Sequence, residues 1–296
     1  MTTAALSADS ASAATTVAAS APVHPGVPTL IVRDLAAVAR YYEEAIGLHR
    51  IDAERDTVRL GAGGKVLLVL RQRADVDLEP VGFAGLFHTA FLMPTRADLG
   101  AWLRRAINAK VEFDGASDHL VSEALYLSDP EGNGIEVYAD RPQAQWRWEG
   151  DQVVMTTEAL DVRNLVAAGG PAGNTIARVP DGMIVGHMHL RVGGIPDAER
   201  FYHNILGLDI TRRRAGATFY STGRYHHHLA TNTWQSQNAP KRSGTTTGLT
   251  SFELLARDGA AFDTAAERLL AAGAKRQGDT IEAADPWGNL VLLKRA

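Results

Sequence analysis

The chain has 296 residues, of which 45% are hydrophobic and 22% charged, a composition typical of a globular protein long enough for two domains. Its net charge is −4, and Lys and Arg are dispersed along the sequence, so the chain lacks the concentrated positive charge typical of nucleic-acid-binding proteins. It has no cysteine, so a disulfide, a thiolate metal site and a cysteine nucleophile are all excluded, and any metal must be held by histidine and carboxylate side chains.

The start of the chain differs in composition from the rest. Residues 1–22 are rich in Ala, Ser and Thr and lack the basic region and continuous apolar core of a signal peptide. We therefore expect a disordered tail over 1–22. No apolar run elsewhere approaches the roughly 20 residues needed to span a bilayer. We expect a cytoplasmic protein without a membrane partner.

An internal repeat organises the remaining sequence. The segment RYYEEAIGL at 40–48 recurs as RFYHNILGL at 200–208, and DPEGNGIEVY at 129–138 corresponds to DPWGNLVLL at 285–293. The repeats define four units, each predicted to form a strand, an amphipathic helix and then two or three strands. The units lie near residues 27–72, 86–140, 186–232 and 248–295. The predicted fold class is α+β, with four tandem βαβββ units.

These units group into two halves. We predict an N-terminal domain over 23–142 and a C-terminal domain over 184–296, joined by a linker over 143–183. The linker carries Trp146 and Trp148. We expect both tryptophans to pack the linker onto a domain rather than to bind a ligand.

The second unit ends in a strand–turn–strand segment that carries an unusual acid. SEALYLSD predicts a strand, DPEGNG a turn, and IEVYAD the returning strand. On the returning strand Glu136 alternates with Ile135 and Val137, so its side chain points to the opposite face. A carboxylate in an apolar strand needs a cation, a hydrogen-bond donor or a metal as its partner, because burying an unpaired charge is very costly.

Three consecutive histidines follow Tyr225 in the strand-like stretch RYHHHLATNTW. Alternation predicts that His227 faces one side while His226 and His228 face the other. A histidine whose pKa lies near neutrality can act as a general acid and base. The alternative is a hydrogen-bonded or metal-scavenging surface cluster.

The tandem βαβββ units resemble the vicinal-oxygen-chelate superfamily, which includes glyoxalase I, bleomycin-resistance proteins and the extradiol ring-cleaving dioxygenases. In that superfamily two units form a cupped sheet around a metal, with ligands on the first and last strands of a unit. The resemblance implies two such glyoxalase-like domains. It also implies metal ligands at His88 and Glu136 in the second unit and at His187 in the third, a 2-His-1-carboxylate set.

The first and fourth units carry no matching set. Their equivalent positions hold Val27, Leu292 and either Thr250 or Ser251. A complete site therefore requires the second unit to face the third, within one chain or across a dimer. A site within the first two units, with His24 as the third ligand, is the alternative. The ligand-free units would serve as scaffold or as the surface of a homo-oligomer.

Other interpretations of the histidines stay open. A lone histidine on an apolar strand is often a hydrogen-bonded core residue. His189 shares the parity of His187 and could replace it as a ligand, although the spacing to Val192 favours His187. Three ligand-type residues at three equivalent positions are nevertheless hard to explain by packing alone.

The segment from His119 to Glu136 has the spacing H-x5-LY-x2-DP-x-G-x3-E, which resembles the signature of extradiol dioxygenases. The resemblance implies that Glu136 binds iron, that Tyr126 hydrogen-bonds near the metal, and that His119 lies behind the ligands or in the substrate channel. Ser117 departs from the residue type usual at its position, which puts the role of His119 in doubt. For Tyr126 the alternative is a core aromatic residue with a polar partner.

The stretch HHHLA resembles the HHxLA segment of the same enzymes, whose second histidine is the acid–base residue. That role carries over to His227, with His228 as the substitute.

Over residues 24–296 the chain resembles the two-domain catechol 2,3-dioxygenases that degrade aromatic compounds in aerobic soil bacteria. The resemblance implies an oxidoreductase that uses Fe(II), or Mn(II), to cleave a catechol with dioxygen to a 2-hydroxymuconic semialdehyde. A dioxygenase that cleaves hydroquinones is the nearest alternative. A glyoxalase-like isomerase or lyase would need a second carboxylate, which Leu292 does not supply, and a bleomycin-resistance-type binding protein would need no triad.

Overall fold

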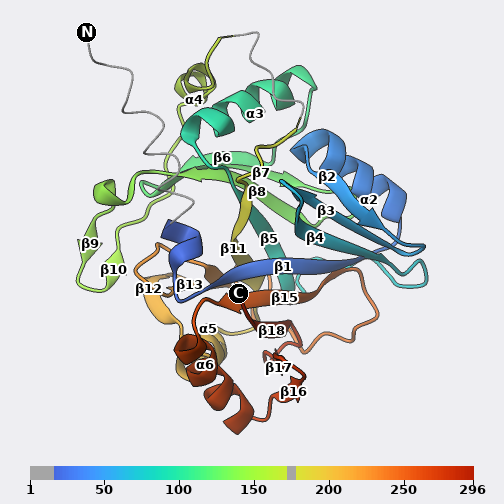
Figure 1. Ribbon diagram of the computed structural model, residues 1–296, viewed down its shortest axis with the longest axis vertical. Coiled ribbons are helices and arrows are strands. Elements are labelled where there is room, and N and C mark those ends of the chain that lie inside the picture. Colours follow the sequence, from blue (N-terminus) through green and yellow to red (C-terminus); the bar gives the residue numbers. More distant parts are fainter. Residues whose placement is uncertain (1–16, 172–177) are drawn as a thin grey trace.

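The computed structural model describes residues 17–171 and 178–296, and most of its strands belong to two eight-stranded sheets (Figure 1). The first sheet contains, in spatial order, β2 (His49–Ala53), β3 (Thr57–Ala62), β4 (Lys65–Gln72), β1 (Val23–Val32), β15 (Gly248–Ala256), β18 (Leu290–Arg295), β17 (Thr280–Ala284) and β16 (Lys275–Gln277). The second contains β6 (Gly115–Asp118), β7 (Ser122–Ser128), β8 (Gly134–Asp140), β5 (Gly85–Leu92), β11 (Ile184–Arg191), β14 (Leu229–Asn232), β13 (Ala217–Ser221) and β12 (Asp209–Arg214).

The remaining elements are helices and one small hairpin. The hairpin consists of β9 (Trp148–Glu149) and β10 (Gln152–Val153). The helical segments are α2 (Leu35–Tyr41), η1 (Tyr42–Ile46), α3 (Arg96–Asn108), η2 (Gln143–Gln145), α4 (Val162–Ala168), α5 (Ile195–Glu199), η3 (Arg200–Ile205) and α6 (Gly259–Ala271). In Figure 1, α3 and α4 lie at one end of the molecule and α5 and α6 at the other. The predicted α+β class is confirmed.

Each sheet joins units from opposite halves of the sequence. Strand β5 pairs antiparallel with β11, which unites the second and third units, and β1 pairs antiparallel with β15, which unites the first and fourth. The prediction that the second unit faces the third is confirmed, and the pairing occurs within one chain. The halves at 23–142 and 184–296 thus each contribute one unit to each sheet.

The repeated sequences adopt the same local structure. RYYEEAIGL ends in a π-helical turn in which the Gly47 amide donates to the Tyr42 carbonyl, and RFYHNILGL ends in one in which Leu206 donates to Phe201. In the DPxGN turn before β8, one Asp129 carboxylate oxygen accepts from two backbone amides and the other accepts from Asn133. Asp285 makes the same set of bonds before β18.

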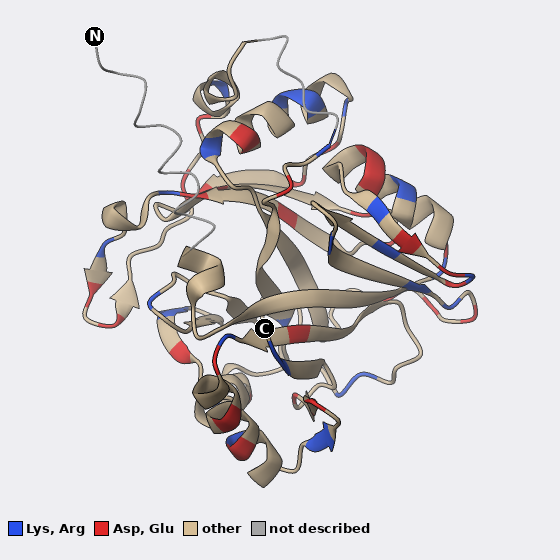
Figure 2. Ribbon diagram, in the orientation of Figure 1, with Lys and Arg blue, Asp and Glu red and all other residues tan. Residues whose placement is uncertain are grey.

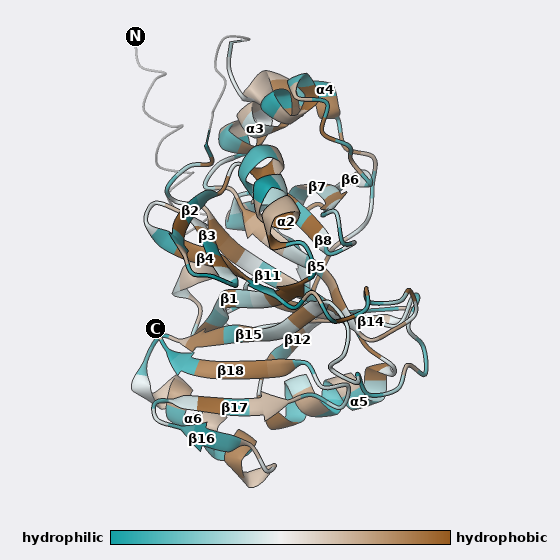
Figure 3. Cartoon of the chain, turned by 90° about the vertical axis from the view of Figure 1, so that its right-hand side faces the viewer, coloured by the Kyte–Doolittle hydropathy of each residue, from teal (hydrophilic) through white to brown (hydrophobic). Residues whose placement is uncertain are grey.

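Hydrogen bonds and apolar packing both fix the helices to the sheets. Thr95 caps α3 by accepting from the Asp98 amide, and the Trp102 indole on this helix donates to the Ile46 carbonyl of the first unit. Charged residues are prominent on α2, α3 and α6, whereas the central strands carry few (Figure 2). The strands β15 and β18 are largely hydrophobic (Figure 3). Burial of apolar side chains between helices and sheets stabilises the fold.

The prediction of a disordered tail over 1–22 is wrong for residues 17–22, while residues 1–16 lie outside the described part of the chain. Residues 17–20 form a helical turn. Ala18 and Ala21 are buried, and the Ala18 carbonyl accepts a hydrogen bond from the His228 ring. Composition alone could not reveal that partner.

Trp146 and Trp148 pack the start of the segment 143–183 against the third unit, as expected. Trp146 is buried beside Tyr225, with ring centroids 5.5 Å apart, and its indole donates to the Arg141 carbonyl. The Arg224 guanidinium lies 4.3 Å from the centre of the Trp148 ring. Among the residues described, no helix is long and apolar enough to cross a membrane.

A glycine on β11 allows the close approach of Tyr138. A Cβ added at Gly186 would lie 1.9 Å from the Tyr138 hydroxyl oxygen. We expect Gly186→Ala to lower the free energy of unfolding by about 1–3 kcal/mol, because overpacking forces neighbouring groups to move. Gly115→Ala is the control, since its Cβ would meet nothing closer than a Tyr126 ring atom at 3.8 Å. Equal denaturation midpoints for the two variants would contradict this prediction.

Candidate metal centre

Three buried side chains converge at the seam between the second and third units. His88 lies on β5, His187 on β11 and Glu136 on β8. The Nε2 atoms of the two histidines are 3.3 Å apart, and they lie 3.0 and 3.2 Å from the same Glu136 oxygen, Oε2. Within the described residues, this is the one group of three or more such donors whose geometry could hold a metal ion.

The spacing of these donor atoms fits a divalent transition metal. Three ligands about 2.1 Å from one ion and at right angles to each other lie about 3.0 Å apart. The three observed separations of 3.0–3.3 Å come close to that value. Two imidazoles and one carboxylate suit Fe(II), Mn(II) or Zn(II) and leave coordination positions for other molecules. These side chains could therefore hold such an ion.

The pKa shifts of the donors favour the protonation states that bind a metal ion. Burial alone would raise the pKa of Glu136, but His187 and His88 together hold it well below its ordinary value. Burial lowers the pKa of His187, although the Glu136 charge opposes that shift. At neutral pH the site therefore presents an ionised carboxylate beside a neutral His187 imidazole.

A cavity of about 240 Å³ opens over the three side chains. Its walls are mainly apolar, and Trp234 is exposed to solvent. The lining residues outside the triad are Phe87, Ser117, His119, Tyr126, Met155, Thr156, Thr157, His189, Arg214, Phe219, His227 and Trp234. An apolar cavity with a few convergent polar groups is the usual form of a small-molecule site.

The structure brings His119 and Tyr126 together at the cavity wall. The Nδ1 atom of His119 lies 2.6 Å from the Thr156 carbonyl oxygen, so Nδ1 carries the proton. Its Nε2 atom therefore accepts from the Tyr126 hydroxyl, also at 2.6 Å. Tyr126 faces Glu136 across the β7–β8 ladder. Burial and the Glu136 charge raise the pKa of Tyr126 well above its ordinary value, so the phenol keeps its proton.

Of the histidines at 226–228, His227 alone lines the cavity. Its ring centroid is 4.2 Å from that of His187, and burial lowers its pKa well below the ordinary value. His228 does not line the cavity and is bound instead to Ser221 and to the Ala18 carbonyl. The predicted strand is wrong for 225–228, because regular pairing begins at Leu229 after a turn at Gly223 and Arg224, which both have positive φ.

His189 also faces the cavity, although the sequence assigned it no role beyond that of a possible ligand. The Trp234 amide donates to Asn232 Oδ1, which turns Asn232 Nδ2 toward His189 Nε2 at 2.9 Å. His189 is thus held by an amide and stands outside the three-donor group. Its shared parity with His187 is the sequence signal that places it on this face.

The first and fourth units contain no equivalent centre in the described chain. Leu292 faces Glu253 across the β15–β18 pair, where the other sheet has Glu136 beside Ala90. His24 lies on β1 in this sheet, and its Nδ1 bonds to the Pro25 carbonyl. His24 is therefore not a third ligand for the His88–Glu136 pair.

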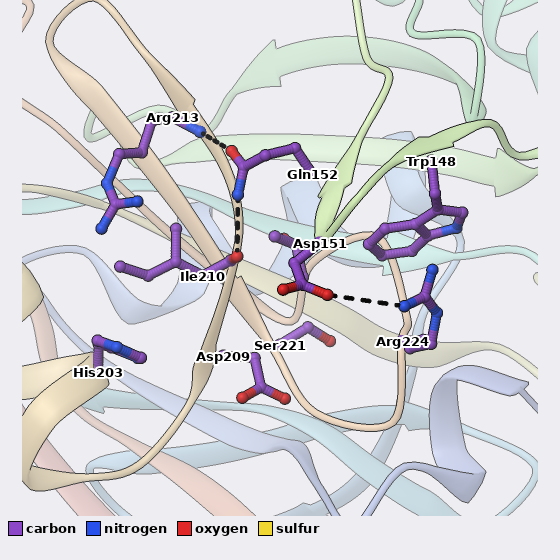
Figure 4. Close-up of a pocket in the computed structure, with 10 residues that line it drawn as sticks. Trp148, Asp151, Gln152, His203, Asp209, Ile210, Arg213, Ser221 and Arg224 are labelled. Carbon is purple, nitrogen blue, oxygen red and sulfur yellow. Dashed lines mark hydrogen bonds and ion pairs between the residues drawn. The ribbon is translucent and has the colours of Figure 1, made fainter.

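A larger cavity of about 430 Å³ lies between the β9–β10 hairpin and β12 (Figure 4). Its wall is polar, and Gln152 spans it by accepting from the Arg213 amide and donating to the Ile210 carbonyl. None of the residues proposed for the metal or for catalysis lines this cavity. The smaller cavity is therefore the one lined by the candidate metal ligands and by His227.

Comparison with known proteins identifies the family. The sequence pattern of the Glyoxalase/Bleomycin resistance protein/Dioxygenase superfamily matches residues 23–137 and 184–293, and the chain belongs to this superfamily. A protein of Bacillus subtilis (strain 168) named catechol-2,3-dioxygenase is 38% identical over 255 residues, which cover 84% of this chain and 88% of the relative. Within the superfamily the chain is an extradiol dioxygenase.

Solved structures agree on the fold. A putative dioxygenase from Bacillus subtilis superposes with a TM-score of 0.61 at 14% identity, over 92% of this chain and 84% of the other. Glyoxalase I from Zea mays superposes with a TM-score of 0.53 at 15% identity, over 94% of each chain. At these identities the similarity concerns the fold alone.

Removing the carboxylate tests the metal site. We expect Glu136→Gln to abolish retention of Fe(II) after gel filtration, because the charge that attracts the cation is lost. Metal per chain is measured by elemental analysis, with circular dichroism to verify folding. Glu253→Gln, which changes a carboxylate of the other sheet, is the control and should bind iron fully. Full iron retention by Glu136→Gln would show that the ion is held elsewhere.

Proposed function

We propose that this enzyme cleaves the ring of a catechol beside its two hydroxyl groups, using Fe(II) and dioxygen, and releases a 2-hydroxymuconic semialdehyde. The observation that carries the proposal is the convergence of His88, His187 and Glu136 in one cavity with His227. The name of the Bacillus relative, catechol-2,3-dioxygenase, supports the same substrate class.

His88, His187 and Glu136 are the residues that would hold the iron, and three protein ligands would leave coordination positions for other molecules. When bound, the metal would supply Lewis-acid activation of the diol and redox chemistry between the ring and dioxygen. One carboxylate and two neutral imidazoles around a divalent ion give a net charge of +1. That charge favours an ionised catechol over a neutral one.

The cavity walls supply binding and orientation. Phe87, Phe219 and Trp234 offer aromatic surfaces to a planar ring, and Met155 offers a flexible apolar side chain. Such walls exclude water from the reacting atoms, which strengthens the electrostatic interactions inside the cavity. A small aromatic diol is the ligand class that this combination of walls and donors favours.

Proton transfer is proposed for His227. The His227 ring packs against the ring of His187, a proposed metal ligand. As a neutral imidazole it can accept a proton from a catechol hydroxyl and return one as the ring opens. Tyr126 keeps its proton and is oriented by His119, so it can act as a hydrogen-bond donor beside the ligands. In this proposal His228 has no catalytic role, because both of its ring nitrogens are bound away from the cavity.

The direct test of the reaction is oxygen uptake. The protein is loaded with Fe(II) under anaerobic conditions, mixed with catechol and then exposed to oxygen. We expect one dioxygen consumed for each catechol and a yellow ring-opened semialdehyde. Uptake with hydroquinone but not with catechol would replace the substrate class, and no uptake with either diol at full iron loading would contradict the proposal.

Replacing the proposed base separates chemistry from metal binding. We expect His227→Phe to retain a full equivalent of Fe(II) while kcat for catechol falls by about 10²- to 10⁴-fold, the usual contribution of a general acid–base group. The measurements are stopped-flow turnover and elemental analysis on the same sample. Turnover within a few-fold of the wild type would remove His227 from the mechanism.

A further inference from the structure

A buried line of hydrogen bonds leads from the end of β8 to the cavity. The Asp140 Oδ1 atom lies 2.8 Å from Nε2 of His226, and Nδ1 of His226 lies 2.8 Å from Nδ1 of His227. Asp140 and both histidines are buried, and His227 alone of the three lines the cavity. The line therefore joins a buried carboxylate to the proposed acid–base group.

The order of donors along this line follows from the carboxylate. An ionised carboxylate only accepts hydrogen bonds, so Nε2 of His226 carries a proton. Taken as a neutral imidazole, His226 has a free lone pair on its other nitrogen, Nδ1, which then accepts. Nδ1 of His227 must donate to it, which leaves the Nε2 lone pair of His227 unprotonated.

We infer that Asp140 and His226 are positioning residues that fix the proton of His227 on Nδ1 and leave its Nε2 free to act as a base in the cavity. This inference rests on the proposed function, in which His227 exchanges protons with the diol. It adds Asp140, which no sequence motif marked, and gives a role to His226, which the histidine motif contained without a role. Neither residue touches the substrate cavity.

The surroundings hold the line in one orientation. The Tyr225 hydroxyl donates to the second oxygen of Asp140 at 2.8 Å, and the Tyr138 hydroxyl lies 3.0 Å from that of Tyr225. The Tyr225 ring packs on the His226 ring with centroids 4.1 Å apart. The Thr211 hydroxyl donates to the His226 carbonyl at 2.6 Å. Both the side chain and the backbone of His226 are therefore constrained.

This arrangement predicts an unusual consequence for Asp140→Asn. Because Tyr225 donates to one oxygen of the carboxylate, the carbonyl of the new amide should face Tyr225 and its NH₂ group should face His226. The NH₂ group can only donate, so the proton of His226 moves to Nδ1 and the proton of His227 to Nε2. The substitution hardly changes the shape of the side chain, but it places the protons of His226 and His227 on the opposite ring nitrogens.

The tautomer is measured directly by ¹⁵N-histidine NMR on the Zn(II)-loaded protein, which is diamagnetic. We expect His227 to be protonated on Nδ1 in the wild type and on Nε2 in Asp140→Asn. With Fe(II), the variant should keep a full equivalent of metal while kcat falls at least about tenfold. A mis-set tautomer in a comparable carboxylate–histidine chain costs up to about 10⁴-fold.

A second substitution distinguishes positioning from simple structural support. Tyr225→Phe removes the hydroxyl that orients the amide, so in the double variant Asp140→Asn/Tyr225→Phe the amide can turn its carbonyl to His226. We expect the double variant to regain the Nδ1 tautomer and much of the lost kcat. If both residues served only stability, the double variant would be worse than Asp140→Asn.

Two results would overturn the inference. One is a wild-type His227 protonated on Nε2, and the other is an Asp140→Asn variant with full metal and an unchanged kcat. These results are separable from failure of the proposed function. A wild type that shows the Nδ1 tautomer but consumes no oxygen with any diol would contradict the proposed reaction and leave the hydrogen-bond assignment intact.

Discussion

The antiparallel pairing of β5 with β11 is the contact on which the candidate site depends. Strand β5 carries His88 and β11 carries His187 toward the cavity, and their register brings the two Nε2 atoms within 3.3 Å. Glu136 joins them from β8, which pairs in parallel with β5. If the units paired in sequence order instead, the histidines would lie in different sheets, and neither sheet would have three donors. The hydrogen bonds of one strand pair thus decide whether a metal site exists.

The same seam assembles the rest of the site. Asp140 and Tyr138 come from the second unit, while Tyr225 and the three histidines come from the third. Trp146 covers His226 from the connecting segment, with ring centroids 5.0 Å apart. In the other sheet, Glu253 binds Lys294 and faces Leu292. The two sheets share one topology, and their chemistry differs because of a few side chains at equivalent places.

Much of this architecture could be predicted from the sequence. The repeats gave the four units, and the isolated acid at Glu136 pointed to a polar partner. The count of ligand-type residues required the second unit to face the third. The line from Asp140 to His226 was not predicted, because no motif marks Asp140 and because a turn at Gly223 and Arg224, rather than the predicted strand, orients His226. The packing of residues 17–22 was also missed, because alanine-rich composition carries no sign of the partner His228, which lies 210 positions from Ala18.

The most direct test of this account is the number of iron atoms per chain in variants that lose one histidine from either side of the seam. Wild-type protein reconstituted with Fe(II) should hold one ion per chain. His88→Ala and His187→Ala should each hold none after desalting, although the two residues lie in opposite halves of the sequence and circular dichroism should show both variants folded. A full equivalent of iron in either folded variant, or two ions per wild-type chain, would contradict a single site shared by β5, β8 and β11.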